Sequence, residues 1–195
     1  ETIVNSMEQY LKSMRQISDT ANYNIIQALD ISSPEFNQEL SLLYDSNKDK
    51  IQSIALYDME GELLVAEPVT LQKKGVEVSR QSWFENAKAK IENMHFSTPH
   101  MQDLFQDDAK RYHWVISLSR AVDVIDGDSP ENGILLVDMK YSFIEEMMDR
   151  INDRTRGRYY YLCDREGKLI YHPYANEISN GLFQENSVLA SSSED

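Results

Sequence analysis

The stretch YDMEGELLVAEP, residues 57–68, has a partner near the other end of the chain, where residues 163–173 read CDREGKLIYHP. Both stretches contain Asp-x-Glu-Gly-x-Leu, then apolar residues, then Pro. In the first, Gly61 can adopt positive φ, which predicts a tight hairpin between two strands, and residues 164–167 predict a second hairpin. Each copy also follows a predicted helix. We therefore interpret the repeat as the first two strands of one sheet architecture that the chain uses twice.

A long helix precedes the first copy. Residues 2–30 contain a stripe of apolar or small residues at alternating steps of three and four, formed by Val4, Met7, Leu11, Met14, Ser18, Ala21, Ile25 and Ala28. Such a helix is about 42 Å long at a rise of 1.5 Å per residue. Two interpretations remain open: a long core helix, or a stalk that packs on the domain and also pairs with a second copy.

Three further helices are predicted in the first half of the architecture. Residues 35–49 form one, and residues 79–93 form another, with Ser82 as its N-cap and with one face made by Trp83, Ala87 and Ile91. Residues 141–151 form the third. Its core-facing residues are Phe143 or Ile144 and Met147 or Met148.

Strand patterns lie between these helices. The predicted strands are residues 51–58, 61–68, 93–101, 112–124 and 134–139, with turns at 106–111 and 126–133. The segment 112–124 alternates so that one face carries Tyr112, Trp114, Ile116 and Leu118. One antiparallel sheet with helices around it indicates an α+β fold. After residue 151 the pattern restarts, with strands at 157–164 and 167–173 and a polar tail at 187–195, so the second copy is incomplete.

Composition argues against several classes of partner and chemistry. The formal net charge of −14 makes nucleic acid and anionic lipid surfaces poor partners. Cys163 is the only cysteine, and the histidines lack the i, i+4 spacing of a helical zinc site. Neither a phosphate-binding Gly-rich loop nor a Gly-x-Ser-x-Gly elbow is present. We expect no metal, no cofactor and no catalytic residue, so this chain is not expected to be an enzyme.

The chain resembles a double Cache domain, a PAS-like extracellular sensor module. The resemblance rests on the phrases IALYDMEGELLVAEP, SRQSWFENA, VISLSRAV, GILLVDMKYSFIEEM and YYYLCDREGKLIYHP. It implies a stalk helix at residues 1–34, a membrane-distal module at 35–151 and the start of a membrane-proximal module at 152–195. These phrases are most similar to the sensor regions of YesM-type transmembrane histidine kinases of Firmicutes.

This resemblance also implies a setting and a mode of action. The module is expected on the outside of a bacterial, Gram-positive cell membrane, between two membrane helices that lie outside this segment. Its expected partners are a small polar ligand, such as an amino acid, an amine or a carboxylate, and a second copy that pairs through the N-terminal helix. Chemoreceptor and diguanylate-cyclase outputs fit the same sensor. The alternative function is a dimerisation or partner-interaction module that binds no small ligand.

The resemblance further implies a ligand site in the distal module. Amino-acid-binding members have an Arg two residues before a Trp-Tyr pair, then a later Tyr and a later Asp. The Arg holds the ligand carboxylate, the Asp receives the ammonium, and the aromatic rings exclude water. Carried over to this sequence, the site consists of Arg80, Trp83, Phe84, His100, Tyr112 and Asp138.

The match departs from the family pattern in three places. Arg80 lies three residues before Trp83 rather than two, which on a helix turns the side chain by about 100°. Phe84 stands where the family has Tyr, and either His100 or Tyr112 takes the place of the later Tyr. Structural roles stay open beside these binding roles: core packing for Trp83, a cap or surface ion pair for Arg80, and a helix cap for Asp138.

Overall fold

The computed structural model describes residues 2–107, 109–127, 129–153, 159–163 and 167–174. The chain divides into two compact units, Glu1–Tyr141 and Ser142–Asp195. Each unit is described by itself below.

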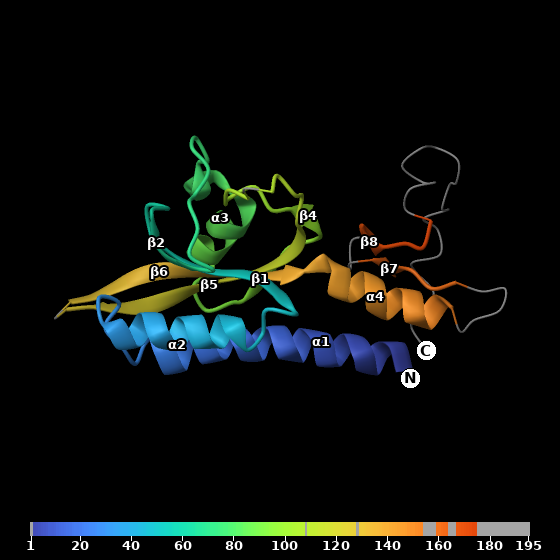
Figure 1. The fold of residues 1–195 in the computed structure, drawn as a ribbon, viewed down its shortest axis with the longest axis horizontal. Helices are drawn as coiled ribbons and strands as arrows, with labels where there is room; N and C mark the ends of the chain where they lie inside the picture. Colours follow the sequence, from blue (N-terminus) through green and yellow to red (C-terminus); the bar gives the residue numbers. More distant parts are fainter. Residues whose placement is uncertain (1, 108, 128, 154–158, 164–166, 175–195) are drawn as a thin grey trace. The chain divides into compact units, whose positions relative to one another are not determined.

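An antiparallel sheet forms the centre of the first unit (Figure 1). Its strands are β1 (Ile51–Asp58), β2 (Leu63–Glu67), β3 (His95–Phe96), β4 (His100–Met101), β5 (Trp114–Asp126) and β6 (Ser129–Lys140). Their order across the sheet is β2-β1-β6-β5-β3, and β4 also pairs with β5. The predicted combination of helices with one antiparallel sheet is therefore confirmed for this unit.

Helices cover both faces of this sheet. The helices α1 (Thr2–Asp19) and α2 (Pro34–Asp45) pack on one face, and α3 (Ser82–Ala89) packs on the other (Figure 1). The central strands are therefore buried on both sides, and β1 reads as a nearly continuous apolar run rather than an alternating one.

The N-terminal helix is less regular than its sequence predicts. After α1 the chain continues as a π-helix, Thr20–Ile26, which the predicted single α-helix over residues 2–30 did not include. Because a π-helix places its hydrogen bonds five residues apart, it shifts the phase of the buried stripe. Tyr10 and Ile17 are buried, whereas Leu11 is exposed, so the predicted stripe is wrong at that position.

The α2 helix confirms the predicted second helix and has a clear start. The Ser33 hydroxyl accepts a hydrogen bond from the Phe36 backbone nitrogen at 3.1 Å, and Pro34 occupies the first turn. The α3 helix is shorter than predicted. Its N-cap is Gln81 rather than Ser82, and Ile91, which was expected on the buried face, lies beyond the helix end with 61% exposure.

Two strand predictions need correction. The expected strand at 93–101 is split into β3 and β4, with Pro99 between them, because proline cannot donate to a strand ladder. The expected turn at 126–133 is mostly strand, since β6 begins at Ser129. Pro130 is tolerated there because β1 pairs with β6 only from Gly133 onward, so that β6 pairs with β5 alone at Pro130 among the described residues.

The predicted common face of residues 112–124 holds only in part. Ile116 and Leu118 are buried, but Trp114 is exposed and Tyr112 precedes β5 with 79% exposure.

The hairpin between β1 and β2 is confirmed: Gly61 has a φ of +93°.

The second unit contains the helix α4 (Tyr141–Asn152) from its second residue onward, and the strands β7 (Leu162–Cys163) and β8 (Leu169–Tyr171), which pair antiparallel. Ile144 and Met148 are the buried residues of α4, which decides between the predicted alternatives. The hairpin residues 164–166 and the polar tail lie outside the described residues. Across the described part of the chain, no helix combines the length and apolarity that a bilayer crossing requires.

Candidate polar binding site

Sheet register brings three polar side chains into one row on the face covered by α3. Ser53 of β1 and Ser117 of β5 both pair with Asp138 of β6, which lies between them. Side chains of directly paired residues point to the same face of a sheet. Leu136, two residues before Asp138 on β6, belongs to the apolar core under α3, so the polar row continues that face.

Asp138 is almost completely buried, with 1% exposure, and is held by three neutral donors. The Ser117 hydroxyl donates to Oδ1 at 2.6 Å. The Gln102 amide donates to Oδ2 at 3.2 Å and the Ser53 hydroxyl to the same atom at 3.3 Å. Gln102, which follows β4, also donates to the Ser53 hydroxyl at 3.1 Å, so its amide contacts both Ser53 and Asp138.

His100 extends this network away from the carboxylate. Its Nε2 atom lies 3.2 Å from the Ser117 hydroxyl, and its Nδ1 atom lies 3.1 Å from the Thr98 carbonyl oxygen. The Nδ1 atom also lies 3.2 Å from the Ser97 hydroxyl. The Ser117 hydroxyl therefore joins the imidazole of His100 and the carboxyl group of Asp138 in one network.

The electrostatic balance at Asp138 is unfavourable for its charged form. Burial raises the pKa of the Asp138 carboxyl group above its usual range, and the hydrogen bonds from Ser117, Gln102 and Ser53 and the charge of His100 offset this only in part. No Lys or Arg forms an ion pair with this carboxylate in the described part of the chain. The site is thus a buried acid that pairs with no Lys or Arg among the described residues.

A second buried polar atom lies in the same region. The Tyr57 hydroxyl has no hydrogen-bond partner among the described residues, although its side chain is fully buried. Burial, followed by the charges of Asp138 and Asp103, raises the pKa of Tyr57. An unsatisfied buried hydroxyl costs free energy, so this one is available to a further partner.

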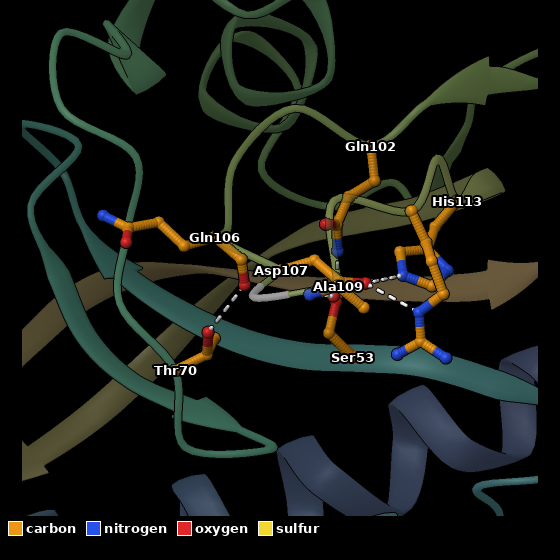
Figure 2. A network of polar contacts seen from close by, with 8 residues as sticks. Ser53, Thr70, Gln102, Gln106, Asp107, Ala109 and His113 are labelled. Atoms are coloured by element: carbon orange, nitrogen blue, oxygen red, sulfur yellow. Dashed lines mark hydrogen bonds and ion pairs between the residues drawn. The ribbon is translucent and has the colours of Figure 1, made fainter.

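A pocket of about 380 Å³ lies beside the network. It is lined by Gln52, Ser53, Pro68, Val69, Thr70, Gln102, Phe105, Gln106, Asp107, Ala109, Arg111 and His113. Figure 2 shows Gln102 pointing toward Ser53, with Asp107 and His113 beside them. Ser53 and Gln102 therefore separate the pocket from the Asp138 carboxylate, which their polar atoms contact directly.

The structure brings together only two of the six residues that the sequence indicated, His100 and Asp138. Trp83 and Phe84 lie in the apolar cluster under α3, with their ring centroids 5.7 Å apart, and Trp83 also packs against Tyr57 at 5.6 Å. Arg80 forms an exposed ion pair with Glu77, with its Nε atom 2.7 Å from the carboxylate. As given above, Tyr112 is exposed, and it is not among the pocket-lining residues.

Sequence reasoning missed Ser53, Ser117, Gln102 and Tyr57. The two serines interrupt otherwise apolar strands, which is a visible signal, because a polar residue inside a buried strand needs a partner. Which serine faces Asp138 depends on strand register, which the sequence pattern does not specify. Gln102 lies in an irregular segment and offers no periodic signal at all.

Acidic and histidine side chains do not gather into a metal site in the part of the chain that the structure describes. The polar row consists of a carboxyl group, hydroxyls, an amide and an imidazole that exchange hydrogen bonds around the buried Asp138.

Comparisons with known proteins agree with this architecture. A family model described as a Cache domain matches residues 1–193. A sequence search among curated proteins gives no match.

Solved structures of chemoreceptor ligand-binding domains share the fold at low identity. The domain of Pseudomonas aeruginosa PAO1 PctC in complex with GABA is 17% identical with a TM-score of 0.62, over 87% of this chain and 70% of that one. Pseudomonas fluorescens CtaA with L-isoleucine is 16% identical with a TM-score of 0.61, over 88% and 64%. Campylobacter jejuni Tlp3 with 4-methylisoleucine is 14% identical with a TM-score of 0.59, over 95% and 72%.

Proposed function

Because the chain belongs to the Cache domain family, we propose that it is the ligand-sensing domain of a membrane receptor, facing the outside of the cell. In this proposal its first unit binds a small polar molecule, and a positively charged group of that molecule pairs with Asp138. The observation that carries the proposal is the buried Asp138 carboxyl group, which pairs with no Lys or Arg among the described residues and lies next to a pocket of about 380 Å³.

Free-energy considerations favour a cationic ligand. Burying a carboxylate without a counter-charge is costly, and hydrogen bonds from neutral donors compensate only partly. An ammonium group that displaces Gln102 from Oδ2 supplies both a charge and up to three donors. The Tyr57 hydroxyl, which is unsatisfied among the described residues, provides an additional acceptor or donor for the same molecule.

The solved neighbours support this class of ligand. The molecules named in those complexes are GABA, L-isoleucine and 4-methylisoleucine, all of which carry an ammonium group and a carboxylate. We extend only the ammonium group to this chain on the basis of Asp138.

The larger assembly is part of the proposal. We propose residues 35–151 as the membrane-distal module, 152–195 as the start of the proximal one, and residues 1–34 as a stalk helix that pairs with a second copy. The output that we favour is a histidine kinase, as the sequence resemblance implies, and a chemoreceptor output is favoured by the solved neighbours. Ligand binding acts by shifting the population between two arrangements of the dimer, so the ligand must bind one of them more tightly.

A second candidate function is a module that binds no small ligand and serves dimerisation or partner contact. It is favoured by the position of Trp83 and Phe84, which fill the core under α3, and by Gln102, which already occupies one Asp138 oxygen.

A thermal-shift screen with amino acids, amines, carboxylates and sugars distinguishes the two candidates. At 100 times its dissociation constant, a binder stabilises the domain by about 2.7 kcal/mol, which raises the melting temperature by about 5–11 °C at this size. We expect the shift for ammonium-bearing compounds in the wild-type protein and in Asp123→Asn, an exposed acid on β5, and no shift in Asp138→Asn. Absence of any shift with the wild-type protein supports the second candidate.

A further inference from the structure

We propose that the first unit carries a second binding site at the β3 edge of its sheet, where Arg15 and Lys90 bind a phosphate group. The ligand is inorganic phosphate or a small phosphomonoester. The site does not involve Asp138, so it stands or falls separately from the proposed function.

Elements from the two faces of the sheet meet at this edge. The strand β3 is the last in the order β2-β1-β6-β5-β3. The helix α1 packs on one face and α3 on the other, and residues 90–94 lead from the end of α3 into β3 (Figure 1). A hollow of about 420 Å³, here called the edge pocket, is lined by Arg15 of α1 and by Lys90, Glu92, Asn93, Met94 and His95. The edge pocket therefore lies between the N-terminal helix and the segment that follows α3.

Arg15 is positioned by an aromatic ring. Its guanidinium carbon lies 5.8 Å from the centroid of the Phe96 ring on β3, within the range of a cation–π contact. This contact consumes no N–H group, and the Arg15 side chain donates no hydrogen bond to any described residue. Its five donors, arranged in a rigid fork that matches phosphate oxygens, are therefore available to a ligand.

The segment after α3 is folded around the backbone of Lys90. The Lys90 backbone nitrogen donates to the Asn86 carbonyl oxygen at 3.1 Å and closes α3. The Lys90 carbonyl oxygen accepts from the Asn93 backbone nitrogen at 3.0 Å, and the His95 Nε2 atom lies 3.4 Å from the same oxygen. These contacts use backbone and imidazole atoms, so the Lys90 ammonium group and the Asn93 side-chain amide keep their donors for a ligand.

The charges of the edge pocket are not neutralised from within. Neither Arg15 nor Lys90 forms an ion pair with an acid in the described part of the chain, and Glu92, the one acid of the lining, pairs with neither. The sequence has 19 Lys and Arg against 33 Asp and Glu, so acidic partners are abundant. Like charges that line one hollow repel each other, and an anion between them removes this repulsion.

A phosphate group fits this set of donors better than a carboxylate does. A phosphomonoester carries a charge of about −1.5 to −2 at pH 7 and three strong acceptor oxygens. The two cations match that charge, and the Asn93 amide adds a neutral donor. A carboxylate supplies one charge and two oxygens, which leaves one of the cations without a counter-charge.

Isothermal titration of the domain at pH 7.5 tests the inference, with inorganic phosphate and glycerol 2-phosphate as probes and with NaCl holding the ionic strength constant. We expect at least one phosphate to bind, whereas glycerol, which lacks the phosphate group, does not. Arg15→Gln and Lys90→Gln each weaken binding by about tenfold or more, as the loss of charge-assisted hydrogen bonds implies. Unaltered melting temperatures of the free variants establish that they fold.

Two control variants separate this site from its surroundings. Lys12→Gln removes an exposed cation one turn earlier on α1 that does not line the edge pocket, and it should leave the affinity unchanged. Asp138→Asn should also leave it unchanged. The inference is overturned if neither phosphate binds, if both Arg15→Gln and Lys90→Gln bind as the wild type does, or if either control loses binding. A failure of ammonium compounds in the thermal-shift screen removes the proposed function and leaves this site standing.

Discussion

Three hydrogen bonds hold the Asp138 carboxyl group, and burial raises its pKa. A raised pKa in the folded state means that the folded protein binds the proton more tightly than the unfolded chain does. Ionisation of Asp138 therefore lowers the free energy of unfolding of the ligand-free domain. This loss can be measured as a dependence of stability on pH.

We expect the free energy of unfolding of the ligand-free domain to fall as pH rises from the ordinary aspartate pKa of about 4 toward the raised folded value. Asp138→Asn lacks this titration. The difference in unfolding free energy, variant minus wild type, should therefore grow with pH, by at most about 1.4 kcal/mol per pH unit. Urea unfolding at a series of pH values measures it.

Taking the difference cancels the titration of groups that both proteins share. Asp123→Asn, on the exposed part of β5, serves as the control and should show no such trend. A difference for Asp138→Asn that is constant over the same pH range contradicts the raised pKa.

The roles of individual site residues were only partly predictable from the sequence. Asp138 was predictable because a charged residue inside the run ILLVDM requires an explanation. The serines that hold it were not, because their role depends on which residues face each other across β1, β6 and β5. Arg80 was misleading: spacing along the sequence cannot show that a 3-10 turn directs this side chain toward Glu77.

Hairpins and strand register position the site at the scale of elements. The β1–β2 hairpin sets the position of β1, and β1 carries Ser53 into line with Asp138. The turn depends on Gly61, whose φ is +93° and whose missing Cβ leaves room for the Ser79 backbone nitrogen, 2.9 Å from where a Cβ would lie.

We expect Gly61→Ala to destabilise the domain more than Gly75→Ala. Both glycines have positive φ, so both variants carry the backbone strain of about 1–2 kcal/mol. Only Gly61 adds a clash, because a Cβ at Gly75 meets nothing within 4 Å. Denaturant unfolding at fixed pH measures the two losses. Equal losses contradict the claim that packing on Ser79 fixes this hairpin.

Element types were predictable where periodicity is long, and boundaries were not. The helix predicted at residues 35–49, which forms as Pro34–Asp45, and the strand at 51–58 were predicted because their patterns are regular. The strand β6 was predicted too short, since Pro130 and Gly133 are turn residues in isolation. Here tertiary pairing overrides that local preference, because β5 is long enough to pair with the whole segment.

At the scale of the whole molecule, the long N-terminal helix bears on self-association. Leu11 belongs to the apolar stripe of the sequence, yet the sheet does not cover it. An uncovered apolar position on a long helix agrees with the proposed stalk that pairs with a second copy.

Leu11→Glu is therefore expected to weaken self-association, measured as a shift of the monomer–dimer equilibrium in analytical ultracentrifugation. Leu42→Glu on α2, also exposed, is the matched control and should leave the equilibrium unchanged. A wild-type protein that stays monomeric at all concentrations, or a dimer that Leu11→Glu leaves intact, contradicts pairing through this helix.

The family was within reach of the sequence because order and spacing of several phrases carry it together. The ligand was not, because ligand identity depends on side chains that meet only after folding. Asp138, Gln102 and Ser53 come from three separate segments, and no local pattern joins them.

A crystal structure of the domain grown with its strongest binder from the thermal-shift panel tests the central claim most directly. We predict a cationic nitrogen of the ligand about 3 Å from a carboxylate oxygen of Asp138, with Gln102 moved off that oxygen. A ligand bound on another surface, with the Asp138, Ser117 and Gln102 contacts unchanged, contradicts the account.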